Sequence, residues 1–369
     1  MFLPCYFMLL RLGEMLFIIY TTGRCNLNCS YCGGSFDPKI VPWSVKYSLN
    51  DLESLIGEED VVAFYGGEPL LNQEFIKDFM DIFTVSKWVV QTNGLLLHRL
   101  EKNIIERFDT ILVSIDGDGS LTDRFRGRGI YRRVLENVKK IREDGYAGDI
   151  IARMTVTEES SIYRDVEHLL STGLFNHIHW QISFIWTDPW KNLWKWIEES
   201  YKLGLLKLFN EWIERLEDGI VDGIVPFQGV LRRMIYGGLA PPCGSGSESF
   251  TILTDGRIIS CPIAVSEKWS QVGSIKEISR DYLESLRPHI SEPCSICSYF
   301  KICGSRCLYT HIERLWGEEG MEAVCECSRY LIDLVKGNIE YIGKLALSEN
   351  LTLKDISYPE YNNTVEIIP

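Results

Sequence analysis

The chain has 369 residues, of which 46% are hydrophobic and 12% are aromatic. This length predicts two domains, and the apolar content is enough to bury a core in each of them. The formal net charge of −13 argues against nonspecific nucleic-acid binding and against anionic membrane surfaces, since both reward positive charge on a protein. We therefore expect no nucleic acid and no membrane as partner, whereas a basic peptide is compatible with this charge.

The first ten residues are apolar but are not expected to anchor the chain in a membrane. The run is too short to span a bilayer, Arg11 and Glu14 interrupt it, and no small-residue cleavage site follows. We interpret residues 1–14 as an N-terminal extension, with Met8 or Met15 as the start of translation.

The first half of the chain alternates apolar runs of strand length with amphipathic stretches of helical period. This alternation is typical of a parallel α/β architecture. Strands are predicted at 16–20, 61–65, 88–91, 110–115, 150–156 and 178–184, and helices at 50–56, 72–83, 97–107, 131–143 and 165–170. In barrels of parallel strands the chemistry gathers at the C-terminal ends of the strands.

Residues 186–235 are helical in pattern and rich in tryptophan. Trp190 and Trp194 are four positions apart, so we expect them on one face of a helix. We interpret this segment as a helical bridge that packs against the mouth of the barrel. The alternative is an aromatic wall for substrate, formed by the tryptophans from Trp186 to Trp196.

The remainder of the chain predicts a hairpin and a helix. Residues alternate in character on both sides of Asp255-Gly256, which predicts a β-hairpin over 249–260 with a tight turn. A helix is predicted over 330–346. The residues after 357 lack periodicity, and we expect them to lie on the surface.

Ten of the twelve cysteines fall into two arrays. The first array is Cys25-x3-Cys29-x2-Cys32. Three thiolates on one short loop can hold three irons of a cubane cluster and leave the fourth iron open to a small molecule, whereas an ordinary electron-transfer cluster takes four cysteines. A zinc loop or a disulfide is the alternative, although disulfides are typical of small secreted domains.

The second array lies in the C-terminal third of the chain. Its members are Cys243, Cys261, Cys294, Cys297, Cys303, Cys307 and Cys325. The pair Cys294-x2-Cys297 alone would suit zinc. Reduced thiolates and iron clusters both indicate a reducing cytoplasm as the location of the protein.

These arrays carry a family resemblance. The first resembles the signature of the radical S-adenosylmethionine (SAM) superfamily, and the second is similar, spacing by spacing, to the SPASM extension of that superfamily. The resemblance implies an α/β fold: a partial (β/α)6 radical SAM barrel followed by a small α+β SPASM domain with a β-hairpin and iron–sulfur clusters. The implied segments are the barrel at 15–185, a helical linker at 186–239, the SPASM domain at 240–330, and a C-terminal helix and tail at 331–369.

The resemblance also implies three [4Fe–4S] clusters, one that binds SAM and two auxiliary ones. The implied ligands are Cys25, Cys29 and Cys32 for the first, Cys294, Cys297, Cys303 and Cys325 for the distal auxiliary cluster, and Cys243, Cys261 and Cys307 for the proximal one. Some relatives have a further cysteine just before the position of Cys243, but residues 236–239 contain none. We therefore expect either an open iron on the proximal cluster or a fourth ligand from Cys327 or from a substrate thiol.

Further motifs match the SAM site of the superfamily: Gly-Gly-Glu-Pro at 66–69, Gln-Thr-Asn-Gly at 91–94 and Ser-Ile-Asp-Gly at 114–117. The implied cofactor contacts are Tyr31, Gly66, Gly67, Glu68, Asn93, Ser114, Asp116, Arg153 and Gln181, with Ser183 beside the last. Arg126 and Arg153 are both candidates to pair with the SAM carboxylate, because a guanidinium fork matches a carboxylate. We expect Arg153 to do so. A surface ion pair is the alternative for either arginine, and above all for Arg126.

The implied activity is reductive cleavage of SAM to a 5′-deoxyadenosyl radical, which abstracts hydrogen from a peptide or protein. The implied partners are that substrate and an external reductant of the ferredoxin or flavodoxin type. Pro262 follows Cys261 where sulfatase-maturing relatives carry an aspartate base, so formylglycine formation is not expected. The alternatives are a small-molecule enzyme, such as a haem-synthesis relative, and a noncatalytic iron–sulfur carrier.

Overall fold

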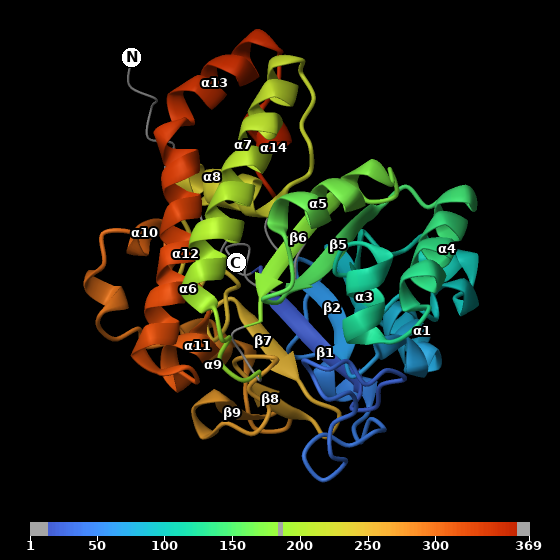
Figure 1. Ribbon diagram of the computed structural model, residues 1–369. Helices are drawn as coiled ribbons and strands as arrows, with labels where there is room; N and C mark the ends of the chain where they lie inside the picture. The colour runs from blue at the N-terminus through green and yellow to red at the C-terminus, as the bar shows by residue number, and fades with distance from the viewer. Residues whose placement is uncertain (1–13, 184–186, 360–369) are drawn as a thin grey trace.

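A computed structural model describes residues 14–183 and 187–359, and one continuous nine-stranded sheet runs through it (Figure 1). The strand order is β6-β5-β4-β3-β2-β1-β7-β8-β9, and β1 to β6 run parallel. These six strands are β1 Leu16–Thr22, β2 Val61–Gly66, β3 Lys87–Thr92, β4 Thr110–Ser114, β5 Asp149–Val156 and β6 His177–Ile182. The predicted α/β class and all six predicted strands are confirmed, although the predicted end of the sixth strand, residue 184, is outside the described residues.

Helices connect the parallel strands. They are α1 Gln73–Ile82, α2 Lys102–Ile105, α3 Gly119–Arg126, α4 Ile130–Glu143 and α5 Ile162–Ser171, with short 3-10 turns at Leu49–Leu52, Pro69–Asn72 and Leu97–Arg99. The helix predicted at 50–56 is wrong beyond that first short turn. The single helix predicted at 97–107 is also wrong, because Leu100 and Glu101 adopt extended backbone and divide it. Helix α3, which carries Arg126, was not predicted.

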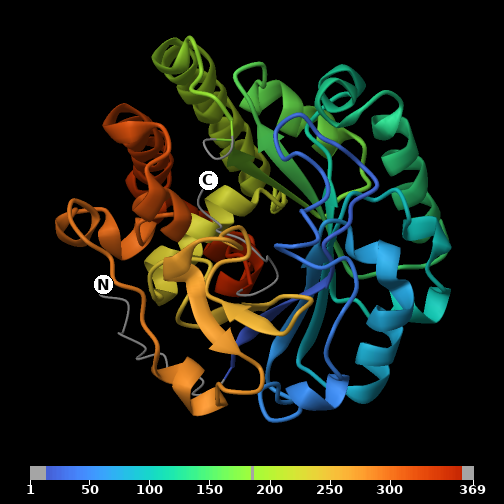
Figure 2. The same ribbon diagram turned by 90° about the horizontal axis from the view of Figure 1, so that it is seen from below.

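Both faces of the parallel sheet are buried, which explains why its strands read as nearly continuous apolar runs. Phe17, Ile19 and Phe64 point to the face that the helices cover, and they belong to one large core. Leu16 and Ile18 point to the opposite face and pack in a second, smaller core. Figure 2 shows the helices along the outer side of the sheet.

The segment after β6 is helical, as predicted. It contains α6 Leu193–Trp196, one π-helical turn at Ile197–Tyr201, α7 Lys202–Glu217 and α8 Val225–Tyr236. Trp190 precedes α6, so the prediction that it shares a helix face with Trp194 is wrong. Its ring packs instead against Trp196 and Trp316, with centroids 5.0 Å and 5.7 Å away. These indoles join the bridge to a later helix, while Trp186 is outside the described residues.

The predicted hairpin is present as β7 Ser249–Ile252 and β8 Arg257–Ile259, which pair antiparallel. A further strand, β9 Gln271–Ser274, pairs with β8. Strand β7 pairs parallel with β1, from Leu16 opposite Ser249 to Ile19 opposite Ile252. The hairpin therefore extends the sheet of the barrel, and the predicted domain boundaries remain predictions.

The C-terminal region is helical around the second cysteine array. It contains α9 Arg280–Ser285, α10 Phe300–Cys303, α11 Leu308–Glu313, α12 Gly317–Gly337, α13 Ile339–Ser348 and α14 Leu353–Ile356, with 3-10 turns at Lys268–Ser270 and Cys294–Ile296. The helix predicted at 330–346 is wrong in its bounds. Two helices occupy this region: α12 begins already at Gly317, and Asn338 separates it from α13. Tyr358 is fully buried, which contradicts the surface placement predicted for the residues just after 357. None of the helices in the described residues combines the length and the apolar character that crossing a membrane requires.

A buried ion pair joins the C-terminal region to the start of the barrel. Asp60, whose side chain is fully buried, binds Arg280 of α9 through Nη1–Oδ2 and Nη2–Oδ1 contacts of 2.5 Å and 2.9 Å. Its carboxylate also accepts hydrogen bonds from the backbone amides of Met15 and Gly57. The same carboxylate thus fixes the beginning of β1, the turn before β2 and helix α9.

We predict that Arg280→Ala lowers the free energy of unfolding by about 2–3 kcal/mol, because it leaves the Asp60 charge buried without its cation. The measurement is thermal unfolding of the anaerobically purified protein, in which the variant should melt several degrees earlier. Arg287→Ala is the matched control: Arg287 is exposed and donates only to nearby carbonyls, so its loss should change stability by less than about 0.5 kcal/mol. Equal melting temperatures for the two variants would contradict the prediction.

Candidate functional site

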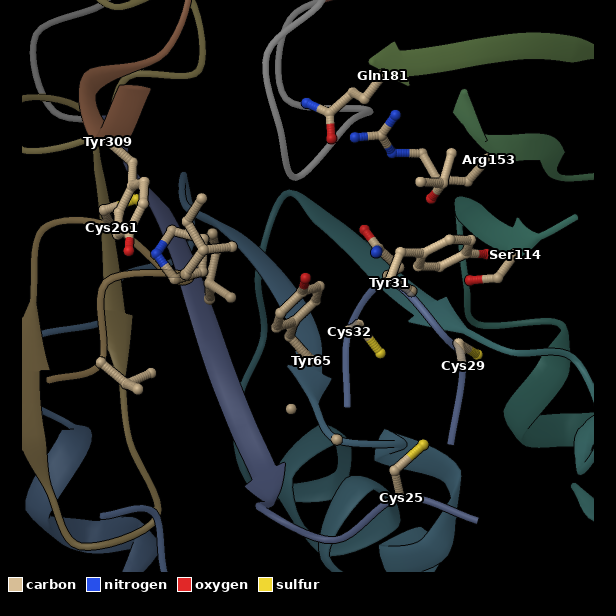
Figure 3. A pocket seen from close by; sticks show the side chains of 18 of the residues that line it. Cys25, Cys29, Tyr31, Cys32, Tyr65, Ser114, Arg153, Gln181, Cys261 and Tyr309 are labelled. Carbon is tan, nitrogen blue, oxygen red and sulfur yellow. The ribbon is translucent and has the colours of Figure 1, made fainter. Parts of the chain in front are cut away.

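A cavity of about 520 Å³ opens at the C-terminal ends of the parallel strands. Figure 3 shows the first three cysteines on one side of it and Cys261 and Tyr309 on the other. The residues predicted from the sequence that line it are Cys25, Cys29, Tyr31, Cys32, Gly66, Gly67, Glu68, Asn93, Ser114, Arg153, Gln181, Cys243, Cys261 and Cys307. Residues that are far apart in the chain, from the first cysteine motif and from the second array, therefore share one cavity.

The loop that carries the first three cysteines leaves the end of β1 and is held by backbone hydrogen bonds. The amide of Gly67 donates to the carbonyl of Thr22 at 3.0 Å, and the amide of Glu68 donates to the carbonyl of Arg24 at 2.8 Å. Ser35 Oγ accepts a hydrogen bond from the amide of Cys25. The Gly-Gly-Glu-Pro turn after β2 is thus joined directly to the residue before the first cysteine.

The three thiols of this loop differ in their surroundings. Burial raises the pKa of Cys25. A hydrogen bond between the Cys29 and Cys32 side chains lowers the pKa of Cys32 to about 6 and raises that of Cys29. One member of the loop is therefore predisposed to be a thiolate, which is the form that binds metal.

Gly67 leaves no room for a side chain. A Cβ atom built on it would lie 2.3 Å from the carbonyl oxygen of Arg24 and 2.5 Å from the carbonyl carbon. Both atoms are backbone, so they cannot move without moving the cysteine loop. Glycine at this position therefore lets the turn after β2 and the cysteine loop pack against each other.

Glu68 organises the same corner of the cavity. Its buried carboxylate accepts hydrogen bonds from the amides of Leu70 and Asn93 and from Thr92 Oγ1. Burial raises the pKa of this carboxyl to about 7, although the three donors oppose the shift. The side chain thus ties the end of β3 to the turn after β2.

Asp116 lies behind the wall of the cavity. The sequence predicts it as a direct cofactor contact, but it is not among the described residues that line the cavity. Its fully buried carboxylate accepts from Arg126 Nε and Nη2, both at 2.7 Å, and from Tyr31 Oη at 2.7 Å. The amide of Thr155 is a further donor, at 2.9 Å. Asp116 therefore positions Tyr31 and Arg126, which do line the cavity.

The two candidate arginines have different places. Arg126 forms the ion pair with Asp116, and its guanidinium carbon is 5.4 Å from the centre of the Tyr31 ring. Arg153 lies on β5 and lines the cavity with only 5% of its surface exposed. Gln181 and Ser183, at the end of β6, line the cavity as well. Arg126 thus forms an ion pair, but the pair is buried and is not the surface ion pair named above as its alternative.

Three tyrosines that sequence reasoning missed stand in the cavity wall. Tyr20 lies on β1, Tyr65 ends β2, and Tyr309 lies on α11. The Tyr20 hydroxyl donates to the carbonyl of Pro262 at 2.7 Å, and its ring centre is 5.5 Å from that of Tyr65. Tyr65 directly precedes the Gly-Gly-Glu-Pro turn, and this position in the sequence could have indicated that its side chain lies at the cavity. In Figure 3 it stands between the two cysteine groups.

The second array divides into two groups in space. Cys243, Cys261 and Cys307 line the main cavity, and Cys261 and Cys307 pack in one cluster with Tyr309. A separate cavity of about 30 Å³ is lined by the other four cysteines: Cys294, Cys297, Cys303 and Cys325. Burial raises the pKa of Cys303 to about 12.

Cys327 belongs to neither group. It is two positions after Cys325 on α12, so the two side chains point to nearly opposite sides of the helix. Cys327 is fully buried in the main hydrophobic core and lines neither cavity. Its thiol is therefore not part of the cavity wall that Cys243, Cys261 and Cys307 share.

The cysteine groups fit iron–sulfur clusters better than zinc. A zinc site gathers its donors tightly around one ion. In the described part of the chain, no three side chains of His, Cys, Asp or Glu converge in that way. A cubane cluster binds each thiolate at a different iron, so it fits thiols that line one cavity without meeting at a single point.

Comparison with known proteins finds a family model that matches a segment in the first half of the chain. The model of the radical SAM superfamily matches residues 19–169. A stretch of 113 residues is 31% identical to an uncharacterized protein of Methanocaldococcus jannaschii and covers 27% of this chain and 38% of that protein. A stretch of 157 residues is 29% identical to pre-heme d1 synthase of Dinoroseobacter shibae and covers 38% of this chain and 36% of that one. The chain thus spans little more than a third of the length of these curated relatives.

Solved structures resemble most of the chain in fold. Native anSMEcpe with bound AdoMet and the Cp18Cys peptide matches with a TM-score of 0.69 at 18% sequence identity, covering 91% of this chain and 99% of that one. Streptococcus suis SuiB bound to the precursor peptide SuiA matches with a TM-score of 0.50 at 15% identity, covering 80% of this chain and 72% of that one. At these identities the likeness establishes a shared fold.

We predict that Gly67→Ala lowers both the iron content of the first cysteine site and the affinity for SAM, because the new methyl group displaces the backbone of Arg24 and with it Cys25. The measurements are iron analysis and SAM binding by the anaerobically reconstituted protein. Gly343→Ala, in α13, is the control, since a Cβ atom there meets nothing within 4 Å. Unchanged iron content and SAM affinity in Gly67→Ala would mean that residues 66–69 form only a turn.

Proposed function

We propose that the chain, whose residues 19–169 match the model of the radical SAM superfamily, is a peptide- or protein-modifying enzyme of that superfamily. The proposal rests on one observation above all: the half of the cavity beyond the SAM residues has aromatic walls, with cysteines of the second array among them and no arginine or lysine in its described lining. The fold likeness to two enzymes solved with a peptide adds support.

We assign the cofactor half of the cavity as follows. Cys25, Cys29 and Cys32 would hold one [4Fe–4S] cluster. Arg153 would pair with the carboxylate of SAM, and Tyr31 would pack beside its adenine, in the orientation that the hydrogen bond to Asp116 gives it. The remaining contacts would come from Gly66, Gly67, Glu68, Asn93, Ser114 and Gln181.

When bound, the cluster and SAM supply the chemistry of the superfamily: one electron from an external reductant of the ferredoxin or flavodoxin type cleaves SAM to methionine and a 5′-deoxyadenosyl radical, which removes a hydrogen atom from the substrate. The protein residues supply position and exclude water. Asp116 performs the positioning from behind the cavity wall and Glu68 from within the wall, because each of them fixes a strand end or a loop that would contact the cofactor.

The charge of the cavity distinguishes between substrate classes. Among the described residues that line it, the basic ones are Arg126 and Arg153, and both belong to the cofactor half. Arg126 is already neutralised by Asp116. The opposite half presents Tyr65, Tyr309 and the partly buried carboxylate of Glu267. Such a surface suits a neutral or basic side chain of a peptide, one residue of which can enter a cavity that SAM also occupies.

A haem-type substrate is the second candidate, and the likeness to pre-heme d1 synthase favours it. Precursors of haem carry several carboxylates, and a site for them would be expected to offer arginine or lysine. The described lining of the substrate half offers neither. We therefore rank the peptide above the tetrapyrrole.

We also propose two auxiliary clusters. Cys294, Cys297, Cys303 and Cys325 would hold the distal one, and Cys243, Cys261 and Cys307 would hold the proximal one in the wall of the main cavity. Because Cys327 is buried on the other side of α12, we propose that the proximal cluster has an iron without a cysteine ligand from the protein. Such an iron would face the substrate.

The test of the proposed substrate class uses deuterium. The reconstituted enzyme, SAM and dithionite are incubated with a peptide pool from a proteome grown in heavy water, and in parallel with a tetrapyrrole rich in carboxylates. We expect the 5′-deoxyadenosine formed with the peptide pool to carry deuterium, because the hydrogen atom comes from the substrate. Unlabelled 5′-deoxyadenosine with peptides, together with a rise in its formation with the tetrapyrrole, would overturn the proposal in favour of the second candidate.

A second prediction concerns the clusters themselves. Changing Cys25, Cys29 and Cys32 together to Ala should remove one cluster and all SAM cleavage while the other clusters remain, because the second array has its own ligands. Iron analysis and Mössbauer spectroscopy provide the count. Cys327→Ala is the control and should retain every cluster. Stoichiometric zinc, or no iron in the triple variant, would exclude the auxiliary clusters.

A third prediction tests the open iron. Added cysteamine should perturb the electron paramagnetic resonance of the proximal cluster and leave that of the distal cluster unchanged, because a free thiolate can bind only an iron that lacks a protein thiolate. Cys261→Ala removes the proximal signal and identifies it. A proximal spectrum that no thiol alters would show that the protein closes the cluster.

A further inference from the structure

Three residues between two cysteines of the second array have an unusual backbone. Gly304, Ser305 and Arg306 lie between Cys303 and Cys307, and all three are left-handed, with φ of 59°, 63° and 58°. Residues other than glycine rarely adopt backbone conformations with positive φ. Two such residues in succession therefore indicate that the positions of their side chains matter more than local backbone preference.

The side chain of Arg306 is buried without an acceptor. Only 3% of the residue is exposed, and neither Nε nor Nη1 has a hydrogen-bond partner among the described residues. An uncompensated buried guanidinium is one of the most unfavourable groups a fold can contain. Its burial therefore implies a negative partner that the protein side chains do not supply.

Two other buried arginines, Arg126 and Arg233, are paired within the protein. Arg126 binds Asp116 through two hydrogen bonds. Arg233, which lies close to α10, donates to the carbonyls of Ile302 and Leu239. These two guanidinium groups bind acceptors of the protein, whereas Nε and Nη1 of Arg306 have none among the described residues.

The surroundings of Arg306 identify the partner. Burial raises the pKa values of the Cys303, Cys325 and Cys327 thiols, and the positive charge of Arg306 opposes that shift in all three. The neighbouring hydroxyl of Ser305 is also buried without a partner among the described residues, and Ser305 lines the cavity of the four distal cysteines. Two successive residues therefore present free donors where these thiolates gather.

We propose that Arg306 is a positioning residue for the distal auxiliary cluster, whose sulfur atoms accept hydrogen bonds from its guanidinium and whose negative charge it balances. The inference rests on the cluster ligands proposed above. A cluster held by four thiolates carries net negative charge, and reduction adds one more negative charge. A buried cation beside it therefore stabilises the reduced form and raises the reduction potential.

The test is a redox titration of the distal cluster, followed by electron paramagnetic resonance, in protein whose Cys25, Cys29 and Cys32 are changed to Ala. Arg306→Gln should shift the midpoint to more negative potential, and Arg306→Lys, which keeps the charge, should shift it less. Arg329→Gln is the matched control. Arg329 also lines the distal cavity, but its side chain is 34% exposed and paired with Glu322, so solvent already screens its charge. A midpoint for Arg306→Gln equal to that of the control would overturn the inference.

A second measurement needs no change at Arg306. Arg329→Gln protein is prepared with arginine that carries a heavy nitrogen isotope only in the guanidinium group. Pulsed electron paramagnetic resonance of the reduced distal cluster should then show coupling to that nitrogen, and its absence would also overturn the inference. Loss of every cluster from the protein without Cys25, Cys29 and Cys32 would be a different result. It would refute the auxiliary clusters of the proposed function, not the placement of Arg306 alone.

Discussion

The buried carboxylate of Asp116 is the constraint on which the cofactor half of the cavity depends. It accepts hydrogen bonds from the cysteine loop through Tyr31, from α3 through Arg126 and from β5 through the amide of Thr155. Two opposite charges are stable in such an interior only while each remains fully paired. Loop, helix and strand therefore hold one another in a single arrangement through groups of the protein itself.

Charges are balanced differently around the C-terminal cysteines. Around Asp116 the protein satisfies its own charges, whereas Ser305 and Arg306 present buried donors that the described protein groups leave unmatched. The charge balance of that region depends on what the thiolates bind. Metal binding and folding are coupled when a site supplies ligands whose charges only the metal group can compensate. The barrel is thus preorganised by side chains, whereas under the proposed function the C-terminal region would be ordered by its clusters.

Much of this arrangement could be read from the sequence, for identifiable reasons. Strands buried on both faces appear as unbroken apolar runs, and cysteine spacing is a local property. Contacts between distant residues are not local: Tyr31 and Asp116 are 85 positions apart, and no periodicity connects them. The sequence pattern also failed for Trp190, which was expected on one helix face with Trp194. The helix begins only at Leu193, so Trp190 precedes it and packs on Trp196. Orphaned donors such as those of Arg306 become visible only when burial is known.

The parallel pairing of β1 with β7 has a consequence for biosynthesis. Strand β1 is made first, yet the partner on one of its sides, residues 249–252, is made only after some 230 further residues. Until then the growing chain presents an unpaired edge of consecutive apolar residues, Leu-Phe-Ile-Ile-Tyr. Such an edge is a template for pairing with other chains. Nascent and truncated forms of this protein are therefore exposed to aggregation along β1, and the last third of the chain protects the first strand.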